Sequence, residues 1–539
     1  MNVFVRSGRA ALTAAALILS IQPTQANQQD PAPAPRPQAP AVAAPEPGRG
    51  GPGGRGGGRG NPSVAVYTER CAACHGTDTA AGRAPNLFDD QWVRAKDDEG
   101  IARVIADGVA QTEMIPFKEQ LTDQQIWQLV AYLKQQGANL KPRPTFVADG
   151  DGQEIKSEKQ TFRIELVARD IETPWGLAFL PDGRLLVTER AGKLRIIPKD
   201  KSGTVVTVTG TPKPWERQDA GYLDVEVHPQ YATNGWIYLA YAEPLPNYTP
   251  PPPTPEGAAP PAPEGRGGRG PQTPNIPSMT TIVRGKINAK NEWTDQQVLF
   301  RAPLDQFTTN NSHYGSRFTF DRQGHLFYTL GERGVMENAQ DLSKPTGKVH
   351  RVNDDGSVPK DNPFVGKAGA LPTIWSYGHR NPQGLAWDPV TGKLWESEHG
   401  PQGGDEINII EPGKNYGWGV ITMGVQPGIT KRSEPGMEQP IVYYTPTIAP
   451  SGMVFYTGNR YPQWKNNLFV SALGGQQLRR LEISGTQVTH QEPVISQLGR
   501  VHDVIIGPDG YLYVTLQLPG QFLSQSTPGT IARLIPVSQ

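Results

Sequence analysis

A unit that recurs from about residue 161 onward constrains the fold of this chain more than any other feature. Each copy contains an apolar strand, a turn rich in Pro, Asp, Gly or Asn, and a second strand of alternating or β-branched residues. The six turns are Pro181-Asp182-Gly183, His228 to Asn234, Asp321 to Gly324, Asp388 to Gly392, Trp464 to Asn467 and Pro508-Asp509-Gly510. The second strands include residues 185–188, 236–239, 326–329, 394–395, 468–470 and 512–515. Six copies predict an all-β six-bladed β-propeller over residues 161–539, with two stacked β-domains as the alternative.

The segment Cys71-Ala72-Ala73-Cys74-His75 uses both cysteines of the chain. Two thiols three residues apart on one helical turn can form thioethers with the two vinyl groups of a haem, and the adjacent imidazole can then ligate the iron. A redox Cys-x-x-Cys pair has no need of the following His, and a zinc site needs further ligands that His75 alone does not supply. The motif therefore predicts a covalent haem c and a role in electron transfer.

A second haem ligand is predicted from the residues that follow this motif. Met114, in Glu113-Met114-Ile115-Pro116-Phe117, is the only methionine of the same region and is the expected axial partner of His75. A methionine is often only core filler, which is the alternative for Met114.

The end of this region has the pattern of a capped amphipathic helix. Thr122 to Gln125 predicts a capping box, followed by an apolar face made of Ile126, Leu129, Val130 and Leu133. We expect this helix to pack against the one that carries Cys71. Together with the haem motif and Met114, residues 63–138 resemble the class I cytochromes c, which implies a small all-α domain near the N-terminus of the chain.

The first residues predict export. Arg6 and Arg9 precede an apolar run over residues 10–21, and Thr24-Gln25-Ala26 is a plausible cleavage site, so residues 1–26 predict a signal peptide. The run is too short to be a stable membrane span, and no other apolar segment is long enough to predict one. Covalent haem attachment of this kind requires export, so we expect a periplasmic protein.

Charge and low-complexity segments bound the possible partners. Lys+Arg and Asp+Glu both count 52, so no net charge favours binding to nucleic acid or an anionic membrane. The Pro/Ala/Gly/Arg-rich residues 27–62 predict a linker rather than an RNA-binding tail, and residues 139–160 predict a second linker. Residues 248–274 predict a disordered insertion in the large domain.

Three polar loops interrupt the predicted strands, and in a propeller such loops converge at the mouth of the channel. The first spans Asn310 to Arg317, the second Gly378 to Gly384 and the third Glu398 to Asn408. The longest exact motif is Gly-His-Arg-Asn-Pro-Gln-Gly at residues 378–384.

These loops resemble those of the soluble sugar dehydrogenases that use pyrroloquinoline quinone, the glucose/sorbosone or aldose sugar dehydrogenase family. The resemblance spans nearly the whole predicted propeller. Further matching segments are Gly347-Lys348-Val349, Asp361-Asn362-Pro363, Asn415-Tyr416-Gly417-Trp418 and Pro446 to Pro450.

The resemblance implies a role for each matching residue. His313 would be the general base that takes the hydroxyl proton of a sugar, a task suited to an imidazole near neutral pH. The carbonyls of Gly400 and Pro401 would ligate a calcium ion that also binds the quinone. The quinone's carboxylates and carbonyls would be held by Arg380, Asn381, Thr447 and Arg500. Glu406, and Tyr416 by its carbonyl, would contribute to a second, structural calcium.

The chain departs from the family pattern at several positions. Gly474 aligns where a quinone-binding lysine is expected, and His502 stands in place of a second arginine. Arg333 stands where a glutamine is expected and is a candidate to compensate for the lost cation. Gln218 and Asp219 are candidates for the loop that in the family contacts base and substrate.

Two functional hypotheses from different classes follow. The first is a periplasmic quinohaemoprotein that oxidises an aldose sugar or a related alcohol and passes electrons through the haem to an external acceptor, such as another cytochrome or periplasmic redox carrier. The second is a propeller without quinone that binds carbohydrate and presents a cytochrome to a redox chain, and the replacements at Gly474 and His502 motivate it. A calcium-dependent hydrolase of the lactonase type is a third option, which the loop motifs disfavour.

Overall fold

The computed structural model describes residues 61–89, 91–140, 151–200, 203–249, 275–518 and 527–537. The chain divides into two compact units, Met1–Arg59 and Gly60–Gln539, of which the first lies outside the described residues. The expected signal peptide, most of the 27–62 linker and most of the 248–274 insertion therefore also lie outside them. Among the described helices, none has the length and apolar character needed to cross a bilayer.

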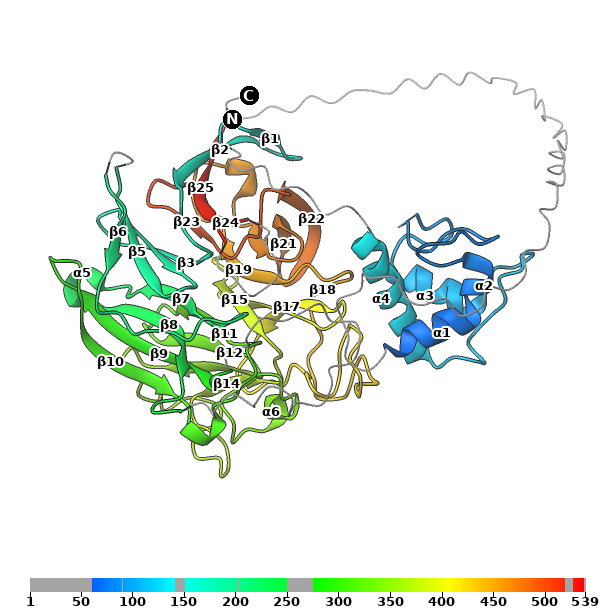
Figure 1. Cartoon of the computed structure of the whole chain (residues 1–539), viewed down its shortest axis with the longest axis horizontal. Coiled ribbons are helices and arrows are strands. Elements are labelled where there is room, and N and C mark those ends of the chain that lie inside the picture. The colour runs from blue at the N-terminus through cyan, green and yellow to red at the C-terminus, as the bar shows by residue number, and fades with distance from the viewer. Residues whose placement is uncertain are drawn as a thin grey trace, which may run out of the picture. The chain divides into compact units, whose positions relative to one another are not determined.

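Within the described residues, four helices follow one another before the first strand (Figure 1): α1 (Pro62–Arg70), α2 (Ala72–His75), α3 (Asp98–Asp107) and α4 (Asp123–Leu140). The predicted capping box opens α4, because the Gln125 N–H donates to Thr122 Oγ1 over 3.3 Å and the Thr122 N–H donates to Gln125 Oε1 over 2.9 Å. These reciprocal bonds satisfy two backbone donors at the helix start.

The predicted apolar face of α4 is buried. Ile126, Leu129, Val130 and Leu133 are each at most 3 % exposed. Tyr67 of α1 packs against Tyr132 of α4, with ring centroids 5.8 Å apart, so the helix preceding Cys71 meets α4 as expected. The helical region is therefore held together by one apolar cluster, to which Cys71 and Met114 also contribute.

The described strands form six sheets, as the repeats predict. Five of them have four strands in chain order: β3 (Pro174–Phe179), β4 (Leu185–Glu189), β5 (Lys193–Ile197), β6 (Val206–Val208); β7 (Tyr222–Val227), β8 (Ile237–Pro244), β9 (Ser278–Ile287), β10 (Trp293–Arg301); β11 (Gly315–Phe320), β12 (Leu326–Leu330), β13 (Lys348–Val352), β14 (Ile374–Tyr377); β15 (Pro382–Trp387), β16 (Leu394–Glu398), β17 (Asp405–Ile410), β18 (Val442–Tyr444); and β19 (Pro450–Phe455), β20 (Leu468–Ala472), β21 (Gln477–Ser484), β22 (Gln487–Ser496). The sixth has the order β1 (Glu154–Lys156), β2 (Thr161–Ala168), β25 (Gly529–Pro536), β24 (Leu512–Gln517), β23 (Val504–Ile506). Short helices in the loops are α5 (Tyr231–Asn234), α6 (Glu337–Gln340), η1 (Leu304–Gln306) and η2 (Pro462–Trp464).

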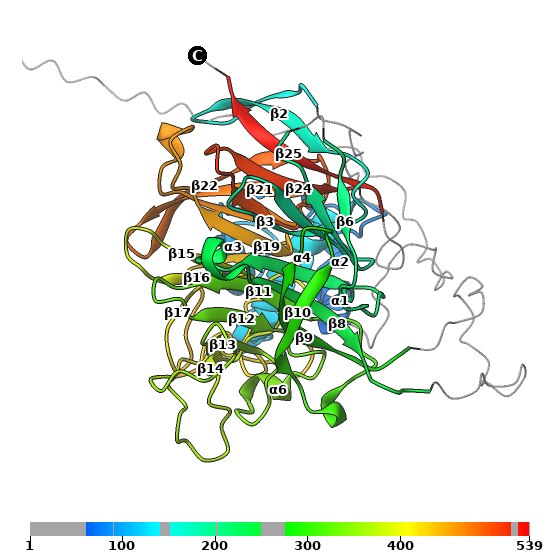
Figure 2. The same ribbon diagram turned by 90° about the vertical axis from the view of Figure 1, so that its left-hand side faces the viewer.

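The sheets form a ring, which Figures 1 and 2 show from two directions. The innermost strands β3, β7, β11, β15, β19 and β23 contact one another in succession, and β23 contacts β3. All six predicted turns join an innermost strand to the strand beside it. The six-bladed β-propeller is therefore confirmed, and the stacked-domain alternative is wrong.

The ring closes by pairing the two ends of the propeller sequence. Strand β2 pairs antiparallel with β25 from Phe162 opposite Pro536 to Ala168 opposite Ile531. The sixth sheet thus combines strands from both ends of the domain, which removes the edges that an open sheet would expose.

Hydroxyl groups on the second strands fix the bulged inner strands. Thr188 Oγ1 accepts from the Gly176 N–H over 2.9 Å and donates to the Leu223 carbonyl of the next sheet over 2.6 Å. Thr329 Oγ1 likewise accepts from the Arg317 N–H and donates to the Pro382 carbonyl over 2.8 Å. Each hydroxyl therefore joins its own innermost strand to the following sheet.

A buried ion triad lies among the innermost strands. Arg317 Nη1 of β11 is 2.9 Å from Asp224 Oδ1 of β7 and 3.1 Å from Oδ2 of Asp503, which directly precedes β23. All three side chains are at most 6 % exposed. Burial raises the pKa of Asp224 to about 7, against the charge of Arg317. The arginine is therefore what allows two carboxylates to share this interior.

The remaining innermost strands meet the same triad. Asp503 Oδ2 accepts from the Leu177 N–H of β3 over 2.9 Å, and Arg317 Nε donates to the Gln383 carbonyl of β15 over 2.9 Å. A Cβ on Gly452 of β19 would lie 2.1 Å from Asp503 Oδ1, so that strand approaches too closely for any other residue. Five of the six inner strands are thus bonded to this charged group, and the sixth, β19, packs closely against it.

Replacing Arg317 by Met should lower the free energy of unfolding of the propeller by about 3–5 kcal/mol, because two buried carboxylates lose their shared cation. The matched control is Arg184→Met, which removes an exposed ion pair with Asp182 and should cost less than about 1 kcal/mol. Urea unfolding followed by tryptophan fluorescence measures both. An Arg317→Met protein as stable as the control would contradict this account.

Candidate active site and cofactor sites

The haem motif lines a large cavity in the helical region. The cavity has a volume of about 590 Å³, and its lining includes Cys71, Cys74, His75 and Met114. Apolar side chains of α3 and α4 complete the wall, among them Ile101, Ile105, Leu129 and Leu133. The structure therefore brings the four predicted haem-binding residues to one mainly apolar cavity.

The orientation of His75 fits an iron ligand. Its Nδ1 lies 2.7 Å from the Pro85 carbonyl oxygen, which can only accept a hydrogen bond. The proton is thus placed on Nδ1, and Nε2 keeps the lone pair that a metal needs.

The loop that carries Met114 is held by hydrogen bonds among its own residues. The Met114 N–H donates to Thr112 Oγ1 over 3.2 Å, and the Met114 carbonyl accepts from the Val109 N–H over 2.9 Å. Gly108 has a φ of +67°, and a Cβ there would lie 2.5 Å from the Met114 carbonyl oxygen. The loop can therefore follow its path only because residue 108 is glycine.

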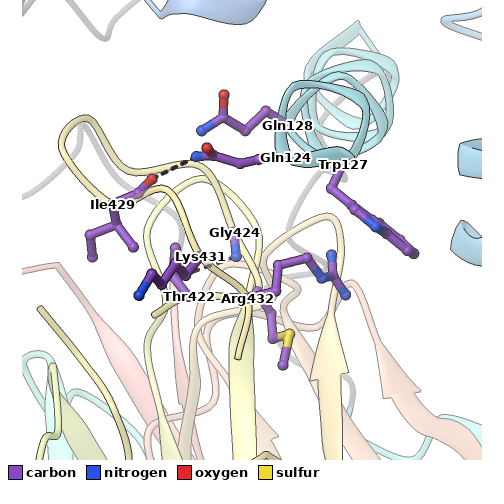
Figure 3. A pocket seen from close by; sticks show the side chains of 9 residues that line it. Gln124, Trp127, Gln128, Thr422, Gly424, Ile429, Lys431 and Arg432 are labelled. Atoms are coloured by element: carbon purple, nitrogen blue, oxygen red, sulfur yellow. Dashed lines mark hydrogen bonds between the residues drawn. The ribbon is translucent and has the colours of Figure 1, made fainter. Parts of the chain in front are cut away.

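A small hollow elsewhere in the Gly60–Gln539 unit is a poor candidate for a site (Figure 3). It is lined by Gln124, Trp127 and Gln128 of α4 and by residues of the 422–432 loop, and Gln124 Nε2 donates to the Ile429 carbonyl over 2.8 Å. Its volume is about 10 Å³, enough for a single water. No substrate or cofactor fits there.

The predicted base His313 lies two residues before the start of β11. Its φ is +55°, a left-handed conformation that few residues other than glycine adopt. Its Nδ1 lies 2.7 Å from Glu332 Oε1, and its side chain is 20 % exposed. Since a carboxylate only accepts, the proton belongs on Nδ1 and Nε2 is the basic nitrogen.

Glu332, which has no role in the sequence analysis, therefore orients the base. Burial acts to raise its pKa, but the hydrogen bond and charge of His313 and the charge of Arg380 outweigh burial and hold the pKa below its ordinary value. Its carboxylate is thus ionised at neutral pH. Glu332 follows the end of β12, and only the pairing of β11 with β12 shows that it meets His313.

Arginines with depressed pKa values gather beside the base. Burial lowers the pKa of Arg190, of Arg380 and of Arg500, that of Arg500 to about 10. The charge of Asp219 opposes the shift at all three, so they share one neighbourhood. Nε of Arg190 and Nε of Arg380 are buried without a hydrogen-bond partner among the described residues. This cluster is suited to a ligand with several anionic groups.

The candidate Asp219 lies directly against the base loop. Its Oδ2 is 3.4 Å from the His313 backbone nitrogen, and its own N–H donates to the Asn311 carbonyl over 3.1 Å. Gln218 is exposed, and its carbonyl accepts from Arg190 Nη1 over 2.9 Å. Of the two candidates, Asp219 is the one that contacts the predicted base.

Arg380 and Asn381 connect the base loop to the loop after β16. Arg380 Nη1 donates to the His399 carbonyl over 3.0 Å. Asn381 Oδ1 accepts from the Gly315 N–H over 3.0 Å, while its Nδ2 lies 3.3 Å from His399 Nδ1. The two residues therefore lie between His313 and the predicted calcium ligands Gly400 and Pro401, which directly follow His399.

Asp405 organises those calcium-ligand candidates. Its Oδ1 accepts from the Gly400 N–H over 2.8 Å, and its Oδ2 accepts from the Thr447 hydroxyl and from the Ile448 N–H over 2.6 Å. The carboxylate is fully buried. It thus fixes the Gly400-Pro401 loop against the Thr447 loop. The Asp-Glu-Ile-Asn motif marks the position of Asp405 in the sequence but does not show these partners.

The departures from the family pattern have definite surroundings. His502 is 1 % exposed, packs against Trp175 with centroids 4.4 Å apart and the rings tilted by 42°, and bonds through Nε2 to Gln517 Oε1 over 2.5 Å. Burial holds its pKa well below the ordinary value, so its imidazole is neutral. A Cβ on Gly474 would lie 3.3 Å from the Ile448 carbonyl, so the expected lysine position adjoins the Thr447 loop.

A cluster of carboxylates surrounds the predicted ligand Glu406. Glu396 and Glu398 project from the same face of β16, opposite Asn408 and Glu406 of β17. Asn408 Nδ2 donates to Glu396 Oε2 over 3.1 Å and lies 3.4 Å from Glu406 Oε2. Burial raises the pKa of Glu396 and of Glu406 well above the ordinary value.

The same cluster carries oxygen atoms that a cation would satisfy. Glu396 Oε1 and Asn408 Oδ1 are buried without a partner among the described residues, and His379, Glu396 and Glu398 offer ligand atoms within 4.8 Å of one another. The Tyr416 ring stacks on His379 with centroids 4.7 Å apart, which places Tyr416 beside the cluster. Hard oxygen donors of this kind fit calcium.

Two family models match this chain. Residues 171–524 match the model described as Glucose / Sorbosone dehydrogenase, and residues 60–133 match the model described as Cytochrome C oxidase, cbb3-type, subunit III. The first match covers well over half of the chain and the second covers the haem motif.

Individual relatives agree with the first match. The chain is 38% identical over 376 residues to "Aldose sugar dehydrogenase YliI" of Escherichia coli (strain K12), which covers 68% of this chain and 93% of that protein. The apo-form of the soluble aldose sugar dehydrogenase from Escherichia coli has a TM-score of 0.59 and 34% identity over 70% of this chain and 100% of that one. The PQQ-bound aldose sugar dehydrogenase from Streptomyces coelicolor has a TM-score of 0.53 and 25% identity over 70% and 98% of the two chains.

The propeller, its loop motifs and these matches agree with one another, while the helical region carries an independent haem motif and its own family match. The chain therefore belongs to the Glucose / Sorbosone dehydrogenase family of enzymes and carries an N-terminal cytochrome c domain.

Proposed function

We propose that this protein is an exported quinohaemoprotein that oxidises an aldose sugar or a related alcohol with pyrroloquinoline quinone. Electrons then leave through the covalent haem c to an external acceptor. The observation that carries the proposal is the group formed by the buried Arg190 and the half-buried Arg380 and Arg500, which share Asp219 as a neighbour with the His313–Glu332 pair. The carboxylates of a tricarboxylate quinone would fit a cluster of cations of this kind.

The residues around the base account for substrate activation. His313 Nε2 would take the proton of the sugar hydroxyl, while Nδ1 keeps its hydrogen bond to Glu332. The ionised Glu332 stabilises the imidazolium that results, because its Oε1 is only 2.7 Å from His313 Nδ1. When bound, the quinone would accept the two electrons that leave the sugar.

The surrounding loops would hold the quinone. Arg380 and Arg500 would pair with its carboxylates, and Arg190, which also pairs with Glu216, would be a third cation near them. Asn381 and Thr447 would bind its carbonyls. The Gly400 and Pro401 carbonyls, fixed by Asp405, would hold the calcium that polarises it.

The helical domain supplies a route for single electrons. His75 and Met114 would ligate the haem iron, and Cys71 and Cys74 would attach the porphyrin. Carrying both domains in one chain raises the effective concentration of each for the other. The residues 1–26 support export to the periplasm, where this type of haem is attached.

Haem reduction by sugar tests the proposal. The haem-loaded protein, with calcium and pyrroloquinoline quinone present, should show reduced-haem bands after addition of an aldose, and His313→Ala should slow this by about 10²–10⁴-fold. The control is His325→Ala, which should leave the rate unchanged. His325 precedes β12, whereas Glu332, the partner of the base, follows that strand. If dithionite reduces the haem but no sugar or alcohol does, the propeller is a binding module rather than an enzyme.

Calcium should stabilise the propeller through the carboxylate cluster. Calcium at 100 times its Kd should raise the stability of chelator-treated protein by about 2.7 kcal/mol, measured as a rise in Tm. Glu396→Gln should gain much less, whereas Glu411→Gln, which alters a solvent-exposed pair with Lys393, should gain as much as the wild type. An equal gain in Glu396→Gln would exclude this cluster as a calcium site.

Met114→Ala should keep the covalent haem but lose the thioether ligand. Its reduction potential should fall, because a Met ligand raises the potential of a haem iron, and added imidazole should bind the iron more tightly. Redox titration and visible spectra measure both effects, with Met336→Ala of the propeller as control. An unchanged potential would show that Met114 is core filler.

A further inference from the structure

The backbone of the base is held in an unfavourable conformation. His313 has a φ of +55°, and Gly315 and Ser316 also have positive φ values. A non-glycine residue keeps such a conformation only where its surroundings impose it. The neighbours of His313 must therefore supply the constraint.

Arg333 contacts the residues on both sides of His313. Its Nη1 donates to the Ser312 carbonyl, and its Nη2 donates to the carbonyls of Asn310 and, over 3.3 Å, of Ser278. Its guanidinium carbon lies 3.5 Å from the centroid of the Tyr314 ring. The side chain is 1 % exposed, so these interactions act away from water.

The neighbours of Arg333 in the chain serve the same loop. Glu332 bonds the His313 imidazole through Oε1 and accepts from the Gly334 N–H through Oε2. Glu332 therefore fixes the ring of His313 while Arg333 fixes the backbone that carries it. The φ of Arg333 is itself +60°, so the segment that carries Arg333 and the segment that carries His313 both have a left-handed residue where they meet.

We propose that Arg333 is a positioning residue that holds His313 in its left-handed conformation and so directs the imidazole into the channel; this rests on the proposed function. The alternative role is to bind a carboxylate of the quinone. The geometry favours positioning, because the two terminal nitrogens already donate to the carbonyls of Ser278, Asn310 and Ser312. One face of the guanidinium is also covered by the Tyr314 ring.

Steady-state kinetics and quinone titration separate the two roles. At saturating sugar and quinone, Arg333→Gln should lower kcat by roughly 10²-fold, the loss that a small misplacement of a reacting group produces. KM, and the quinone Kd from tryptophan-fluorescence quenching, should change less than threefold. Arg333→Lys keeps the positive charge but not the two-pronged guanidinium, so its kcat should lie between those of the wild type and Arg333→Gln. A quinone Kd raised tenfold or more with kcat retained would overturn the proposal.

A measurement on quinone-free protein keeps this inference separate from the proposed function. In ¹⁵N-histidine-labelled protein, the signal missing from His313→Ala identifies His313, and its Nδ1 should be protonated in the wild type. In Arg333→Gln, or in Arg333→Lys if the first variant does not fold, that Nδ1–H signal should be lost to exchange. The exposed Arg322→Gln should leave it unchanged. An unaltered His313 signal in the Arg333 variants overturns the inference even if no sugar is ever oxidised.

Discussion

A single guanidinium, that of Arg317, lies at the centre of the contacts among the inner strands of the propeller. It pairs with Asp224 and Asp503, and through them and the Gln383 carbonyl it reaches sheets that are far apart in sequence. An apolar channel could be filled in several registers, whereas hydrogen-bonded charges have one satisfied arrangement. The placement of the loops at the channel mouth depends on that arrangement, because each loop leaves an inner strand or the strand beside it.

Carboxylates repeat this role nearer the site, each joining two loops. Asp405 fixes the Gly400 loop to the Thr447 loop, and Glu332 fixes its own loop to His313. Glu398 joins the carboxylate cluster to the Arg380 N–H over 2.6 Å. The residues predicted to bind cofactors are therefore held by a framework of buried acids.

The sequence predicts the repeat and the loop positions well, because turns such as Pro181-Asp182-Gly183 and strands such as 326–329 are local patterns. Local patterns also predict the α4 capping box. Glu332, Asp405 and Arg190 escape such reasoning, because each acts on a residue that only the closed ring brings near. The carboxylate cluster had a readable signal, since Glu396 and Glu398 alternate on one strand and Glu406 and Asn408 on the next. No sequence pattern indicates the contacts of Arg333 with the 310–314 loop.

The pairing of β2 with β25 dictates the order of folding. Phe162 finds its partner only when Pro536 is available, so the ring cannot close before the chain has been synthesised as far as that residue. Such distant pairing makes folding slow. The helical domain depends on contacts within about eighty residues and can form while the propeller is still open. During that interval the unpaired edge of β2 is exposed, which makes the incomplete propeller the aggregation-prone stage of this protein's life.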